Sequence, residues 1–139
     1  MSLETAIETL RERNEPVPRP FRLPTDAEVV AAERALGVTF PADYRYFLLR
    51  GSDVAYGTLE PAVVIPDCGA LDLVKVVQMA WRLGVPRDFL PFCEDNGDWY
   101  CFAPDGRIGL LSHDGLRGGS WPDLAHWIEE VWLESAASR

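Results

Sequence analysis

The stretch from Asp88 to Asp114, DFLPFCEDNGDWYCFAPDGRIGLLSHD, constrains the fold of this chain more than any other part. It reads as three short apolar strands joined by two turns, Asn96-Gly97 and Asp105-Gly106. Asn-Gly and Asp-Gly favour two-residue hairpin loops, because both central positions take a positive φ that these residues tolerate. The stretch therefore predicts a three-strand antiparallel meander.

The middle strand of this meander, residues 98–103, is apolar on both of its alternating faces. A strand of this kind is usually central in its sheet and covered on both sides. We therefore expect Trp99 and Phe102 to be buried, and a helix from Trp121 to about Glu134 to pack on the sheet. The residues expected in the core are Tyr44, Phe47, Tyr100, Phe102 and Ile128.

Helices are predicted where apolar residues recur at helical spacing beside capping residues. They cover residues 3–13, 25–36, 41–50, 71–83 and 121–134, the last capped by Ser120. Two short strands are expected at residues 54–59 and 62–65, and a flexible glycine-rich link at residues 115–119. This order of elements is typical of an α+β fold in which helices pack around an antiparallel sheet.

The 139 residues are expected to form a single domain, since a chain of this length can bury a continuous core. Residues 1–24 supply an N-terminal helix and a linker that contains four prolines. No apolar run reaches the length of a membrane span, and the N-terminus lacks the apolar region of a signal peptide.

The charge of the chain indicates its class of partner. The net charge is −9, with 22 acidic and 13 basic residues. Nucleic acid needs a basic patch on its partner, so we expect no nucleic-acid binding and instead a basic protein partner. The three cysteines, Cys68, Cys93 and Cys101, form no paired motif and favour free thiols in a reducing cytoplasm.

Catalytic and metal-binding interpretations are weak. Ser112-His113-Asp114 holds the residue types of a hydrolytic triad, but alternation along a strand turns His113 away from its two neighbours. The spacing of Asp95 and Asp98 around the Asn-Gly turn does not match a calcium loop. We expect no catalytic residue, no metal and no cofactor.

The residues expected to contact a partner are the acids of the exposed hairpin tip, Glu94, Asp95 and Asp98. Asp53 and Asp114 are expected near them. Charges of this kind steer the encounter with a basic partner.

Trp127 is a further candidate for the interface. It lies beside Glu130 and Glu134 on the helical wheel, where partial exposure would make it a binding anchor. The alternative is a tryptophan at the edge of the core.

Three segments together resemble the SUKH superfamily, the SMI/KNR-like domains of bacterial immunity proteins and fungal cell-wall regulators. They are LGVTFPADYRYFL at residues 36–48, Leu90-Pro91-Phe92 with Gly97-Asp98-Trp99-Tyr100, and SWPDLAHWIEEV at residues 120–131. The resemblance covers residues 25–135. One departure is Arg50-Gly51-Ser52-Asp53, where the family often has Asn-Gly, so a contact made there could differ.

The resemblance implies an α+β domain that binds proteins and catalyses nothing. Bacterial members look like antidotes to polymorphic or contact-dependent toxins, many of which are nucleases. The first hypothesis is therefore a cytoplasmic immunity protein that neutralises a toxin by direct binding. The alternatives are a regulatory adaptor for an endogenous protein and a hydrolase that uses Asp95, Asp98 and Asp114 as acids.

Overall fold

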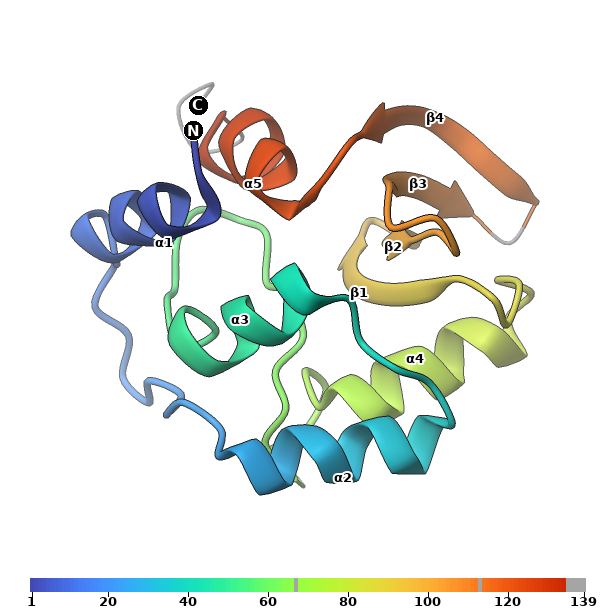
Figure 1. Ribbon diagram of the computed structural model, residues 1–139, viewed down its shortest axis with the longest axis horizontal. Helices are drawn as coiled ribbons and strands as arrows, with labels where there is room; N and C mark the ends of the chain where they lie inside the picture. The colour runs from blue at the N-terminus through green and yellow to red at the C-terminus, as the bar shows by residue number, and fades with distance from the viewer. Residues whose placement is uncertain (67, 113, 135–139) are drawn as a thin grey trace.

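The computed structural model describes residues 1–66, 68–112 and 114–134. Over these residues, the helices are α1 (Leu3–Glu12), α2 (Asp26–Leu36), α3 (Ala42–Arg50), α4 (Leu73–Arg82) and α5 (Leu124–Trp127), which continues as a π-helical segment, η1 (Ile128–Leu133). The strands are β1 (Leu90–Asp95), β2 (Asp98–Phe102), β3 (Ile108–Ser112) and β4 (Gly115–Trp121). The fold is α+β, as predicted, with α1 to α3 beside the sheet and α4 beneath β1 (Figure 1).

The sheet is antiparallel throughout, in the order β1-β2-β3-β4. The predicted meander is confirmed, and β2 lies between two strands. The prediction of a flexible link at residues 115–119 is wrong, because these residues belong to β4 and pair with β3. Glycine still supplies backbone donors and acceptors to a ladder, and the two register shifts between β3 and β4 are the bulges that glycine in a strand often marks.

The two turns of the meander differ. Asn96 and Gly97 have φ of 52° and 89°, as predicted for a two-residue turn. The prediction fails at the second turn, where Gly106 takes a positive φ of 90° and Asp105 does not. The Gly106 N–H donates to the Ala103 carbonyl at 2.9 Å, which closes a turn with Pro104 at its first central position. Proline fixes φ at a negative value, so it selects this wider loop.

Both faces of β2 are covered, as predicted. Tyr100 and Phe102 face the large core that α3 and α5 also enter. Trp99 and Cys101 belong to a smaller cluster with residues of α4 and of the loop after it. The predicted core residues expose at most 7 % of their surface: Tyr44, Phe47, Tyr100, Phe102 and Ile128.

The start of α3 is tied to the start of the last helix through Asp43. Its Oδ1 accepts from the Tyr44 N–H at 2.8 Å, and its Oδ2 accepts from the Leu124 N–H at 3.1 Å. The last helix begins at Leu124 with Asp123 as its N-cap, so the predicted start at Trp121 with a Ser120 cap is wrong. The chain up to Trp121 is occupied by β4, and the helix can begin only after that strand ends.

The two strands predicted at residues 54–59 and 62–65 are absent from the described structure. This segment is irregular except for one bridge between Val63 and Asp72. Five of its apolar residues are nevertheless buried: Val54, Leu59, Ala62, Val63 and Val64. Pro61 cannot donate to a ladder, and the Ala62 N–H donates to the Phe92 carbonyl at 2.8 Å, so the segment crosses β1 rather than pairing along it.

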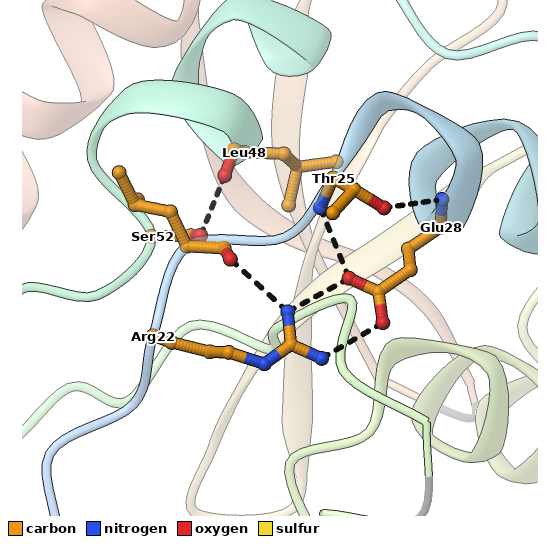
Figure 2. A network of polar contacts seen from close by, with 6 residues as sticks. Arg22, Thr25, Glu28, Leu48 and Ser52 are labelled. Carbon is orange, nitrogen blue, oxygen red and sulfur yellow. Dashed lines mark hydrogen bonds and ion pairs between the residues drawn. The ribbon is translucent and has the colours of Figure 1, made fainter.

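The proline-rich linker is held to the first turn of α2. Thr25 and Glu28 form the predicted reciprocal capping box, and the Arg22 guanidinium forks onto the Glu28 carboxylate with both N–O distances at 2.8 Å (Figure 2). The hydrogen bond from Arg22 is the main reason why the pKa of Glu28 falls to about 2. The linker therefore has a defined path over the surface.

Candidate partner-binding surface

The hairpin tip forms one wall of a groove of about 1210 Å³. The other walls are the outward side of α4 and the irregular segments at residues 58–62 and 69–71. Glu94 and Asp95 line the groove together with Asn96 and Gly97, whereas Asp98 does not. Because α4 packs against β1, the groove rests on rigid elements (Figure 1).

The tip brings like charges together. Asp95 and Asp98 are directly opposite in the last pair of the β1–β2 ladder, so their side chains leave the same face of the hairpin. Both are half-buried, and Glu94 beside them is exposed. Like charges at directly opposed positions destabilise a sheet. The opposed aspartates therefore lower the stability of the fold at this turn. The backbone conformation of Asn96 and Gly97 does not depend on them.

The negative charge of the tip affects the pKa of ionisable groups within the sheet. Burial raises the pKa of Tyr100 to about 12, and the charges of Asp95, Cys93 and Asp98 add to that rise. Burial is also the main cause of the raised pKa of the Cys93 thiol, and the charge of Asp95 raises it further. Tyr100 and Cys93 therefore stay neutral at physiological pH.

Asp114 lies at the same end of the sheet as the tip. Turns in an antiparallel meander alternate between the two ends, so the β1–β2 and β3–β4 turns share one end. Strands are about 4.8 Å apart, which puts the Asp114 turn about 10 Å from the β1–β2 turn. Asp114 is exposed, and its N–H donates to the Ser112 hydroxyl at 3.1 Å. The prediction that Asp114 lies near the tip agrees with this placement.

The structure does not bring Asp53 to the tip, so that part of the prediction is wrong. Its carboxylate binds Arg11 of α1 at 2.9 Å. Arg11 belongs to α1, which lies at the side of the molecule away from the sheet (Figure 1). Asp53 follows α3 directly, and the chain there turns toward α1 rather than toward β1.

Trp127 is buried, with 1 % of its surface exposed, so the prediction of an exposed anchor is wrong and the core alternative holds. Its ring meets Phe92 and Tyr100 edge-on, with centroid distances of 4.9 and 5.3 Å. The helix changes to π-type hydrogen bonding at Ile128. A π-helical turn holds more residues than an α-helical turn, so the wheel that grouped Trp127 with Glu130 does not apply.

Ser112, the serine of the triad-like sequence, is buried, with 5 % of its surface exposed. His113 lies outside the described residues. Among the residues that the structure does describe, no three histidine, cysteine, aspartate or glutamate side chains gather closely enough to hold a metal ion. Within the same ranges, no helix combines the length and apolar character needed to cross a membrane.

Sequence reasoning missed an apolar stripe on the outward side of α4. Val76, Met79 and Leu83 line the groove, and Met79 and Leu83 expose 48 and 52 % of their surfaces. Their spacing of three and four residues could have predicted this stripe. Other apolar residues, Leu73, Val77 and Ala80, form the buried side of the helix. A helix that is apolar on two sides faces either a second core or a binding surface.

The chain matches the SUKH_5 family, described as SMI1-KNR4 cell-wall, over residues 3–133. It is also similar to a protein of known crystal structure from Pseudomonas syringae pv. tomato, with 44% sequence identity and a TM-score of 0.89. That similarity covers 95% of this chain and 99% of the other. No curated protein matches the chain. The family match includes the N-terminal helix and linker, and the chain belongs to the SMI1-KNR4 family of the SUKH superfamily.

Proposed function

We propose that this chain is a non-catalytic immunity protein of the cytoplasm that neutralises a basic toxin domain by direct binding. The observation that carries the proposal is the cluster of Glu94, Asp95, Asp98 and Asp114 at one end of a rigid sheet, beside a groove. The SUKH family supports it, because its bacterial members resemble antidotes to toxins. The thiols of Cys93 and Cys101, which form no disulfide, suit a reducing compartment.

The physical role of the acids is to steer and orient the partner. A chain with a net charge of −9 attracts a basic surface, and a concentrated patch fixes where the two meet. Nucleases need basic active sites to hold phosphate, so a nuclease toxin presents complementary charge. Such complementarity raises the association rate more than the affinity and loses its effect at high salt.

The test compares two variants of equal charge. One carries Glu94→Lys, Asp95→Lys and Asp98→Lys at the tip, and the control carries Glu4→Lys, Glu8→Lys and Glu12→Lys, which are exposed on α1 at the other side of the molecule. Three reversals of two units each take the net charge from −9 to −3 in both variants. Circular dichroism first confirms that both fold.

The wild-type chain is used to capture its partner from the source cells, and the partner is then expressed alone and with each variant. We expect the partner to stop growth by itself, the wild type and the α1 variant to restore growth, and the tip variant to associate about tenfold more slowly at low salt. A captured partner that is harmless when expressed alone would instead favour the regulatory adaptor. Equal association rates for both variants would remove the tip from the interface.

A further inference from the structure

The groove beside the tip has an apolar wall along α4. Met79 and Leu83 are half-exposed, and Val76 continues the same stripe toward the start of the helix. These residues span about two helical turns, or about 10 Å. Methionine adapts its shape to different apolar surfaces, which suits a binding site. This wall therefore offers a straight apolar strip of the length that two turns of a partner helix would cover.

The rim of the groove is acidic. Glu60, Glu94 and Asp95 line it, and among the described lining residues Lys75 supplies the basic charge. An apolar strip facing an acidic wall is complementary to a helix with apolar residues on one side and lysine or arginine along its flank. The charge also argues against a second copy of this chain as the occupant, since two copies at −9 would bring like charges together.

An added strand fits less well than a helix. Strand addition needs a free strand edge, and β1, which borders the groove, has the Phe92 carbonyl already taken by the Ala62 N–H at 2.8 Å. The register of β1 also shifts between Pro91 and Cys93, and Pro91 lacks an N–H. Shifts and prolines of this kind block edge pairing.

We propose that the groove binds one amphipathic α-helix of the basic partner, with its apolar side on Val76, Met79 and Leu83. Its basic residues face Glu60, Glu94 and Asp95. This inference rests on the proposed function and names the contact through which that function is exerted. The acids then steer the partner, while the α4 stripe supplies the contacts that hold it.

The test uses a short peptide of leucine and lysine, about four turns long, with leucine at the spacing of one helical side. A peptide of the same composition in scrambled order, without an apolar side, is its control. The protein variant carries Met79→Gln and Leu83→Gln, which leave the charge unchanged. Its matched control carries Val17→Gln and Leu23→Gln, because these two residues are also exposed apolar side chains but do not line the groove.

We expect the amphipathic peptide to bind the wild type and the Val17/Leu23 variant equally, and the Met79/Leu83 variant at least about tenfold more weakly, as loss of two buried apolar contacts implies. Three results would each overturn the inference: no binding at millimolar peptide, equal binding of the scrambled peptide, or equal binding to both glutamine variants. A captured partner that holds the Met79/Leu83 variant as tightly as the wild type leaves the proposed function standing and excludes the groove.

Discussion

Replacing Asp95 by asparagine separates the effect of the acidic tip on stability from its proposed role in binding. Asp95 and Asp98 are directly opposed, and such Cβ atoms lie about 5 Å apart. Two unit charges at that distance repel by about 0.8 kcal/mol in water, and salt reduces this figure. The asparagine keeps the oxygen that accepts from the Asn96 side chain, so the turn contact at 3.3 Å is preserved. We expect Asp95→Asn to raise the free energy of unfolding by about 0.2–1 kcal/mol.

The stability of Asp95→Asn is measured by urea unfolding at low and high salt, where the gain should shrink as salt rises. A second readout is the alkaline titration of tyrosine. The charge of Asp95 contributes to the raised pKa of Tyr100, about 12, so the variant should titrate at lower pH. Unchanged or lower stability at low salt would refute the repulsion, and a gain in stability without slower association with the partner would mean that the pair serves no binding role.

The remaining predictions concern the core, the turn and the buried ionisable groups. Phe102→Ala should lower the free energy of unfolding by about 3–5 kcal/mol, since Phe102 is buried against Phe92; a loss below about 1 kcal/mol in urea unfolding would contradict this packing. Gly97→Val should destabilise while Gly97→Asn costs less, because φ of 89° resists a β-branched residue. Burial raises the pKa of Cys101 to about 12, so a thiol reagent should leave it unlabelled in native protein and label it in urea. Tyr100 has its pKa raised in the folded state, so its contribution to stability is complete below pH 10 and is lost as the pH rises toward 12, which alkaline unfolding would detect.

The elements that the sequence predicted well are those whose signals are local. The capping box of Thr25 and Glu28 and the Asn96-Gly97 turn depend on residues a few positions apart. The elements that it missed depend on distant partners. Residues 115–121 become a strand because β3 is beside them. Residues 54–65 stay irregular because they cross the edge strand β1, with a hydrogen bond from Ala62 to Phe92, rather than running along it.

The same distinction applies to the candidate site. The acids of the tip were predictable, because an Asn-Gly turn is exposed wherever it occurs. The place of Asp53 was not, since its pairing with Arg11 joins residues 42 positions apart. Trp127 was misjudged because the change to a π-helix alters which residues share a side, and nothing in the local composition announces that change.

Apart from Asp98, which belongs to the acidic tip, the residues that carry the family resemblance serve the fold rather than the proposed interface. Asp43 joins the starts of two helices, and Tyr44 packs against Phe102 with ring centroids 5.0 Å apart. The residues after α3 that depart from the family pattern also contribute to the fold, because the Ser52 hydroxyl donates to the Leu48 carbonyl at 2.6 Å (Figure 2).

The residues that we propose for binding contribute less to the packing of the fold. Met79 and Leu83 are half-exposed on α4, and Glu94 is exposed beside the turn. Substitutions at exposed positions of this kind usually change stability by less than about 0.5 kcal/mol. The groove can therefore change its partner while the fold stays the same. Within this family, the identity of the partner should be sought in the α4 stripe and in the exposed acids of the hairpin tip, and not in the buried residues of the family motifs.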